Sequence, residues 1–212
     1  MVEQPVELEE ISHLYASLME EIKGRLDVVG RAATGRLNMP PMAAFEFCYL
    51  QLRKVCEVFA LACISAHGDV PEVRSKLLQK TYNADQIIKQ LGLLQPDFYP
   101  VPVLQELDPG TAQPVGVVPV ASGFLTKDDL LGLYGECGNH LHRGSIRQLL
   151  KNWEPKPDFE KLKEWVAKIM KLLNHHVIRT SQPDAQLWVL MQDKNDRKVK
   201  CFIMKRVPQP EK

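Results

Sequence analysis

The stretch PPMAAFEFCYLQLRKVCEVFALACI, residues 40–64, predicts a long helix that is covered on more than one side. Two adjacent apolar rows run along it with helical spacing: Met42, Phe45, Tyr49, Leu52, Cys56, Phe59 and Cys63, and beside them Cys48, Val55 and Ala62. The proline pair at 40–41 suits the start of this helix, since proline is tolerated in the first turn. We therefore expect residues 40–64 to form the central helix of a bundle.

Four further segments carry helical periodicity or helix start signals: residues 6–29, residues 71–91, a segment from Thr126 to near Gly144, and residues 159–177. Thr126 is followed by two aspartates, which is typical of an N-cap with acids in the first turn. Asp158 is the expected cap of the last helix. The apolar stripe of that helix runs on to His176 and Val177, so we expect His176 on its buried face.

Residues 93–124 contain six prolines and few helix formers. Long loops without regular structure are uncommon and are usually functional or disordered. This one has apolar residues in PVGVVPV and around Tyr99, so we expect an ordered wrap along the bundle at about 92–125, with a lid over a ligand as the alternative.

The period changes after residue 180. The runs AQLWVLMQ and VKCFIMKR are rich in β-forming residues and are separated by the polar DKNDRK, which predicts an antiparallel hairpin. Two strands alone are marginal in water, so the hairpin should pack on the bundle. The predicted fold is therefore mainly α, a bundle over residues 1–180 with a two-stranded hairpin appendage over 181–212.

Composition points to a globular protein: apolar residues make up 45% and charged residues 25% of 212. Five cysteines form no CxxC pair, which argues against a disulfide framework, and no stretch is apolar enough to cross a membrane. We expect a cytoplasmic protein with reduced thiols. The net charge of +1 divides into −5 for residues 1–150 and +6 for 151–212, which marks a basic surface or lysine-rich faces in water.

The segment YGECGNHLHRG, residues 134–144, concentrates reactive side chains. The histidines and Arg143 precede Gly144, where cations favour the helix dipole and glycine suits the cap, so a helix end is the first interpretation. A catalytic or RNA-contacting role for His140, His142 and Arg143 is the second. A zinc site on Cys137 and His140 is the third; it would need further ligands from elsewhere, such as His175 or His176, and we expect neither a metal nor a cofactor.

Two sets of basic residues are candidate binding residues. Arg53 lies four residues before Glu57 on the central helix, where partial desolvation would make it an anion site; a surface ion pair is the alternative. The hairpin carries an excess of +4 over residues 186–206, and its candidate contacts are Lys198, Lys200, Lys205 and Arg206. Binding of RNA there would depend steeply on salt; protection of the strand edge is the other explanation.

The apolar run RKVCEVFALACI, followed later by a helix that holds Tyr134 and ends near His140 and His142, resembles the HEPN superfamily of helical bundles. It is also similar to bacterial proteins of unknown function that carry a run of the type YGxCGxxLH. Many HEPN proteins are dimeric RNases of toxin–antitoxin and phage-defence systems with an Arg-x4-6-His motif. The resemblance makes His142 the motif histidine, but the residues at the arginine positions are Gly135, Glu136 and Cys137.

From these observations we expect a non-catalytic binding or assembly module of HEPN-like type, in a defence or toxin–antitoxin context. Its expected partners are a second copy, another protein or RNA, and not a membrane. The alternative is a metal-independent RNase in which His142 or His140 acts with a nearby arginine, since histidine can exchange a proton with a ribose hydroxyl.

Overall fold

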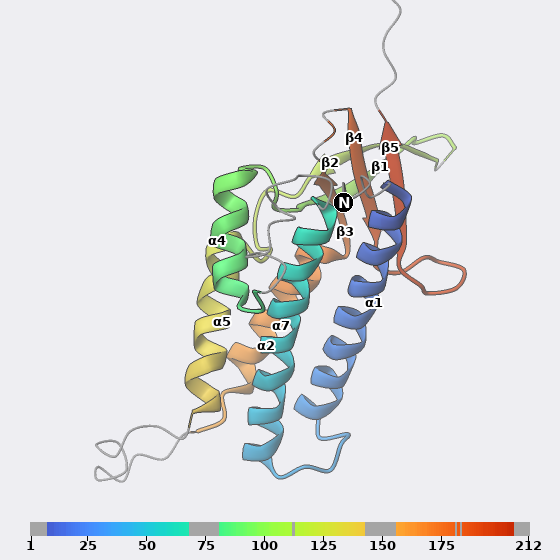
Figure 1. The fold of residues 1–212 in the computed structure, drawn as a ribbon. Coiled ribbons are helices and arrows are strands. Elements are labelled where there is room, and N and C mark those ends of the chain that lie inside the picture. The colour runs from blue at the N-terminus through green and yellow to red at the C-terminus, as the bar shows by residue number, and fades with distance from the viewer. Residues whose placement is uncertain are drawn as a thin grey trace, which may run out of the picture.

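The structure is a computed structural model, and it describes residues 8–67, 81–111, 113–142, 156–180, 182 and 184–205. Within these ranges the helices are α1 (Leu8–Ala33), α2 (Pro41–Ala66), α4 (Ala84–Leu94), α5 (Lys127–Leu141) and α7 (Phe159–Leu173). The strands are β1 (Val101–Leu107), β2 (Pro114–Pro119), β3 (His175–Arg179), β4 (Ala185–Leu190) and β5 (Lys200–Lys205). Figure 1 shows the helices as a bundle with the sheet at one end.

Helix α2 is the central helix, as its sequence predicts. More than half of its residues are buried, including both predicted apolar rows, apart from the half-buried Met42 near its start. It packs against α1 along much of its length and also contacts α4, α5 and α7. The predicted caps are confirmed as well: the Thr126 hydroxyl accepts a hydrogen bond from the amide of Asp129, and the Asp158 carboxylate accepts one from Lys161.

The prediction of a mainly α bundle with a two-stranded hairpin is wrong. The described residues form a five-stranded antiparallel sheet in the order β2-β1-β3-β4-β5. The predicted C-terminal hairpin is present as β4 and β5, paired from Ala185 to Leu190. However, β4 also pairs with β3 along its length, and β3 pairs with β1, so the hairpin is one part of a larger sheet.

Two of the missed strands, β1 and β2, lie in the proline-rich segment that was expected to wrap along the bundle. Asp108 begins the turn between them, and its carboxylate accepts hydrogen bonds from the amides of Gly110 and Thr111. An aspartate that binds the backbone two or three residues on stabilises a tight turn. Pro114 and Pro119 are tolerated because they terminate β2, an outer strand of the sheet, where a missing amide breaks no ladder.

The third missed strand, β3, was assigned to the last helix. Helix α7 ends at Leu173, with Asn174 as its C-cap, and the chain continues directly into β3. His176 is buried as expected, but it lies on a strand. The error arises because His176 falls three residues after Leu173 and so extends the helical stripe, although the period has already changed to two.

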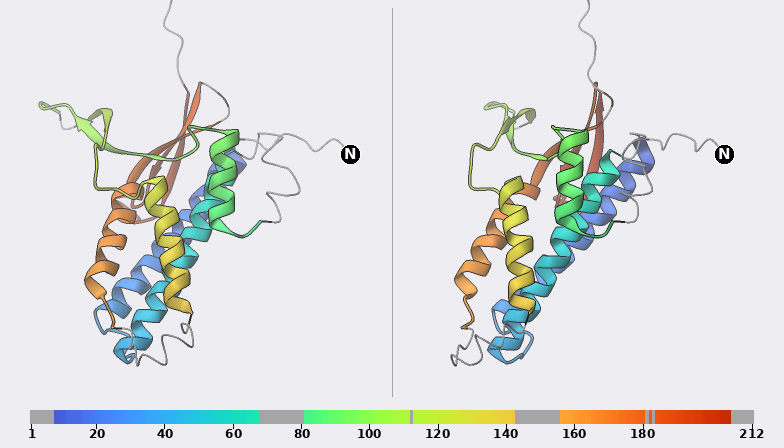
Figure 2. Two further views of the ribbon diagram at one scale, coloured as in Figure 1. Left: turned by 90° about the vertical axis from the view of Figure 1, so that its left-hand side faces the viewer. Right: turned by 60° about the vertical axis from the view of Figure 1, so that its left-hand side comes forward.

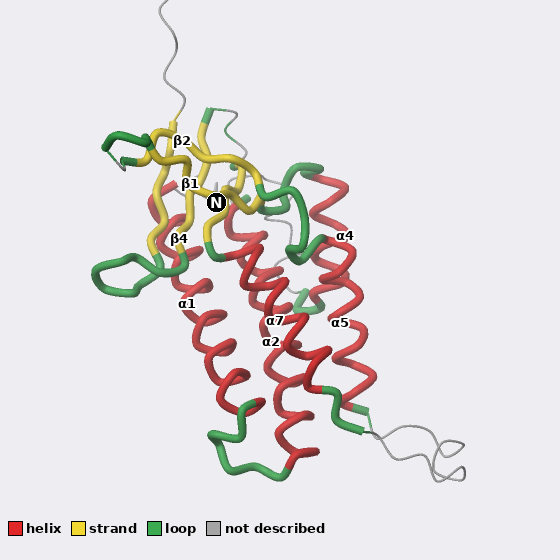
Figure 3. The backbone as a smooth tube through the Cα atoms, turned by 180° about the vertical axis from the view of Figure 1, so that it is seen from behind, coloured by secondary structure: helices red, strands yellow, loops and turns green. Residues whose placement is uncertain are grey.

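The sheet has two distinct faces. Alternate residues of β3, β4 and β5 point toward the helices: His176, Ile178, Leu187, Val189, Cys201 and Ile203. The β1–β2 hairpin lies on the other side of these strands, away from α1, and crosses them at a steep angle (Figures 2 and 3). The β1–β2 end of the sheet is therefore turned relative to β3, β4 and β5.

Of the helix predicted over residues 71–91, the part up to residue 80 lies outside the described residues, and the observed helix α4 begins at Ala84. Among the described helices, none is both long enough and apolar enough to span a membrane.

Candidate functional site

His140 is held in the helix interface. Its ring stacks on Tyr49 at 4.1 Å between centroids and meets the edge of Phe45 at 5.2 Å. Burial lowers the pKa of His140 below its usual value, in spite of Glu136, whose carboxylate lies 4.0 Å from Nε2. The ring is therefore neutral near pH 7 and contributes mainly to packing.

Glu136 connects three helices. It accepts hydrogen bonds from the Tyr49 hydroxyl at 2.6 Å and from Trp165 Nε1 at 3.3 Å, and it forms an ion pair with Lys161 at 2.8 Å. Burial alone would raise the pKa of this carboxyl, but its bonds to Lys161, Tyr49 and Trp165 outweigh burial and lower the pKa. The carboxylate is thus fully engaged in joining α2, α5 and α7.

His142 is the C-cap of α5 and is exposed, while Arg143 lies outside the described residues. We expect His142→Ala to move the thermal unfolding midpoint by no more than about 2 °C, because exposed positions contribute little to stability. Differential scanning fluorimetry measures this change. A shift as large as that of a core substitution would show that His142 is needed for folding, and loss of RNA cleavage in the same variant would support the RNase alternative.

Arg53 is occupied by partners on its own helix and on α5. Its guanidinium carbon lies 4.5 Å from the Tyr134 ring centroid, and Nη2 donates to the Tyr134 hydroxyl at 2.9 Å. Its Nε lies 3.3 Å from Glu57 in the expected ion pair. The cation is thus partly neutralised, which weakens its case as an anion site.

The α5 flank that Arg53 contacts is not the flank on which His140 lies. At 3.6 residues per turn, Tyr134 falls on one side of the buried Cys137 and His140 on the other. Arg53 contacts the Tyr134 side. The contacts among the described residues therefore do not bring this arginine and this histidine together.

The basic residues of the hairpin are dispersed. Lys200 forms an ion pair with Asp196 at 2.7 Å, and Lys198 donates its backbone amide to the same aspartate. Lys205 is exposed at the end of β5, and Arg206 lies outside the described residues. An RNA-binding role for these four residues stays a prediction.

The cysteines carry free thiols, and the four on the helices are buried. Burial raises the pKa of the Cys137 thiol to about 12, so it is protonated at neutral pH and is a poor metal ligand. Within the described part of the chain, no three histidine, cysteine or acidic side chains gather as a metal site would require.

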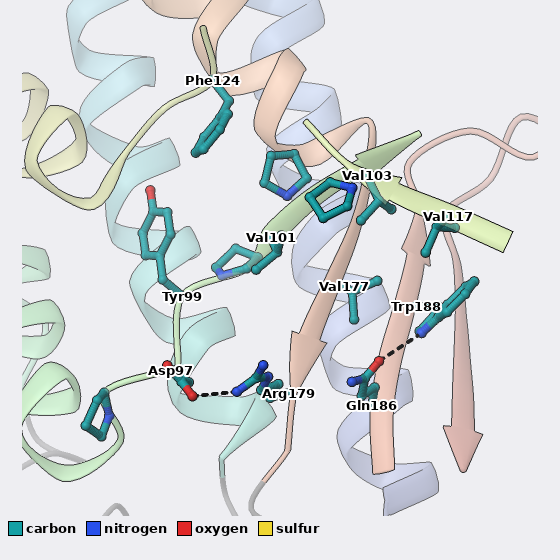
Figure 4. A pocket seen from close by; sticks show the side chains of 14 residues that line it. Asp97, Tyr99, Val101, Val103, Val117, Phe124, Val177, Arg179, Gln186 and Trp188 are labelled. Atoms are coloured by element: carbon teal, nitrogen blue, oxygen red, sulfur yellow. Dashed lines mark hydrogen bonds and ion pairs between the residues drawn. The ribbon is translucent and has the colours of Figure 1, made fainter. Parts of the chain in front are cut away.

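A groove lies between the β1–β2 hairpin and the outer face of β3, β4 and β5, and we call it the hairpin groove; Figure 4 shows one of its two hollows. It consists of two hollows of about 500 and about 370 Å³ that share Val117 and Trp188. The lining comprises Pro96, Asp97, Tyr99, Pro100, Val101, Pro102, Val103, Gln105, Val115, Gly116, Val117, Pro119, Phe124, His175, Val177, Arg179, Gln186, Trp188, Leu190, Phe202 and Met204. These volumes lie within the range of small-molecule sites, roughly 300–1,000 Å³.

The strand register aligns an apolar row across the floor of the groove. Val101 pairs with Val177, Val177 with Trp188, and Trp188 with Phe202, so the row crosses four strands, or about 14 Å of sheet. Val101 and Phe202 are 45% and 48% exposed. Exposed apolar surface that is continuous over several strands is typical of a binding site.

The two charged side chains of the first hollow are paired with each other, and its polar side chains form hydrogen bonds within the protein. Arg179 Nη1 donates to Asp97 at 2.5 Å, and Trp188 Nε1 donates to Gln186 at 3.3 Å (Figure 4). The Tyr99 hydroxyl donates to the carbonyl oxygen of Leu125, which fixes the ring at one wall. The hollow therefore offers an apolar surface with no unpaired charge among its described lining residues.

This groove was not predicted from the sequence, because the strands that form its walls were expected to be a loop and a helix. One signal was available: β-rich runs on both sides of DPGT, residues 108–111, are typical of a hairpin. Comparison with protein-family models, curated proteins and solved structures found no match to this chain. The HEPN resemblance therefore stays a prediction.

Proposed function

We propose that this chain is a non-catalytic binding module that binds its ligand in the hairpin groove. The observation that carries the proposal is the apolar row Val101–Val177–Trp188–Phe202, which lines the two hollows on the face of the sheet away from the helices. Leaving such a surface in water is unfavourable, and covering it with a ligand gains free energy in proportion to the apolar area removed from water.

The contacts of the predicted catalytic residues support a non-catalytic function. His140 packs between aromatic rings, and Arg53 is engaged by Tyr134 and Glu57. The RNase alternative needs a histidine and an arginine that act together on one phosphate. It stays a prediction for His142 and Arg143, as do a homodimer and a defence context.

The test is binding of N-phenyl-1-naphthylamine, a neutral dye whose emission rises in apolar surroundings. We expect the purified protein to bind the dye, and Trp188→Ala to weaken binding at least about ten-fold, since an aromatic ring offers a large contact area. Val101→Lys should weaken dye binding to a similar extent. Because Val101 is more exposed than Trp188, this variant does not disturb the packing around Trp188.

Leu93→Ala is the matched control, because Leu93 is 85% exposed on α4, outside the groove. Its affinity for the dye should equal that of the unchanged protein. Dye binding that Leu93→Ala reduces as much as Trp188→Ala would indicate general surface hydrophobicity, and a folded protein that binds no dye would contradict the proposal.

A further inference from the structure

The second hollow of the hairpin groove contains a buried histidine without a hydrogen-bond partner. His175 is only 8% exposed, yet neither nitrogen of its ring bonds to any residue that the structure describes. Its neighbour His176 points to the opposite side of β3, into the core. The His175 ring packs edge to face against the Trp188 ring, with 6.3 Å between the ring centroids.

Buried polar groups in folded proteins are nearly always hydrogen-bonded, and exceptions call for an explanation. A neutral imidazole offers one N–H donor and one acceptor nitrogen. Around His175 the lining consists mostly of apolar residues: Val115, Val117, Trp188, Leu190, Phe202 and Met204. The hollow thus combines a buried imidazole that has no hydrogen-bond partner and the exposed amide of Gln105 with a mostly apolar wall, as binding sites for apolar molecules commonly do.

We propose that the hairpin groove binds a neutral, elongated apolar molecule with a hydroxyl or carbonyl group that hydrogen-bonds to His175. The apolar part lies along the row from Val101 to Phe202, and Trp188 contacts it in both hollows. This inference rests on the proposed binding function and adds the chemical class of the ligand.

The charges of the groove favour a neutral ligand over an acid. Among the described residues that line the groove, Arg179 is the one with a permanent positive charge. Its guanidinium is already paired with Asp97. Lys200 follows on the same face, opposite Leu190, and is paired with Asp196. A carboxylate would find no free cation among the described lining residues and would bury its charge without a counter-ion, whereas a neutral hydroxyl group needs only the free imidazole.

The volume and the enclosure favour a small molecule over a second protein chain. The hollows are lined jointly by the β1–β2 hairpin and by β3, β4 and β5, so this chain already covers part of the outer face of its own sheet. His175 is only 8% exposed, so a small molecule that enters the hollow can reach its ring more readily than the surface of a second chain can.

The experiment measures displacement of N-phenyl-1-naphthylamine by 1-decanol, decane and decanoate in the full chain. We expect 1-decanol to displace the dye at a concentration about five-fold lower than decane, the ratio that one net hydrogen bond provides. His175→Leu should remove this ratio, because leucine fills the space without a polar atom. His175→Gln, which keeps a donor and an acceptor, should restore it.

The outcomes separate this inference from the binding function beneath it. If His175→Leu keeps the preference for decanol, or if the unchanged protein has none, the role of His175 is refuted while dye binding that depends on Trp188 still supports the groove. Tighter binding of decanoate than of decanol would refute the neutral class and assign recognition to Arg179. If dye binding weakens at higher protein concentration while the protein's molecular mass in solution rises, a second copy of the chain occupies the groove. A folded protein that binds no dye refutes both proposals.

Discussion

Replacing His176 with aspartate should destabilise the protein by about 3 to 5 kcal/mol, the cost of leaving an unpaired charge in a core. His176 is fully buried between α1 and the sheet. Its Nδ1 donates to the carbonyl oxygen of Leu173 at 2.8 Å, so its Nε2 accepts from the Tyr15 hydroxyl at 2.9 Å. An aspartate is shorter and can only accept while it is ionised. Urea denaturation followed by circular dichroism measures the loss, which is a large part of the 5–15 kcal/mol typical of a domain.

His13→Asp is the matched control, since it makes the same chemical change at an exposed position of α1. Its effect should stay within about 0.5 kcal/mol, as at most surface positions. Similar unfolding free energies for the two variants would mean that His176 is not buried as the structure places it.

The second large effect is a loss of stability in mild acid. Burial lowers the pKa of His176 from its ordinary value of 6.5 to about 4. The folded state therefore releases this proton more readily than the unfolded state, and stability falls as the pH decreases from 6.5 towards 4. Between pH 7 and pH 5 the loss from this group is on the order of 2 kcal/mol, and unfolding free energies from urea titrations at both values measure it.

His176→Gln separates this effect from the other titrating groups. Glutamine keeps a donor for Leu173 and an acceptor for Tyr15 but does not titrate. The loss between pH 7 and pH 5 should therefore shrink by about 2 kcal/mol in this variant. His140 and His175, whose pKa values burial also lowers, account for part of the remainder. An unchanged loss would contradict a neutral, buried His176.

The helices could be predicted from the sequence because their signals are local. The two apolar rows of α2, the capping box at Thr126 and the cap at Asp158 each lie within a few residues of the feature they specify. The same holds for β4 and β5, whose alternating residues flank a polar turn.

The sheet could not be predicted in full because its pairing is not local. Strand β1 pairs with β3 some 75 residues away, at Val101 and Val177, and neither segment is stable as a strand without the other. The segment His175–Arg179 is short, and its first residues continue the stripe of α7. Strand β2 begins and ends with proline, which is more typical of loops than of strands, so its sequence did not predict a strand.

The candidate site depends on the pairing of distant strands, so its residues could not be predicted from the sequence, and other residues were predicted instead. His140 and Arg53 attract attention as chemical groups, but the fold engages them in contacts between helices. Trp188 and His175 become candidates only when β3 and β4 align them beneath the β1–β2 hairpin.

The central claim, that the hairpin groove is the ligand site, is tested most directly by the indole N–H signals of the tryptophans in a ¹H–¹⁵N spectrum. Trp188 lies in the groove, whereas Trp165 donates to Glu136 between the helices and serves as an internal reference. Assigned by single Trp→Phe variants and titrated with 1-decanol, the Trp188 signal should shift progressively to saturation while the Trp165 signal stays in place. A titration that shifts Trp165 and leaves Trp188 unchanged, or that shifts neither signal, would contradict the claim.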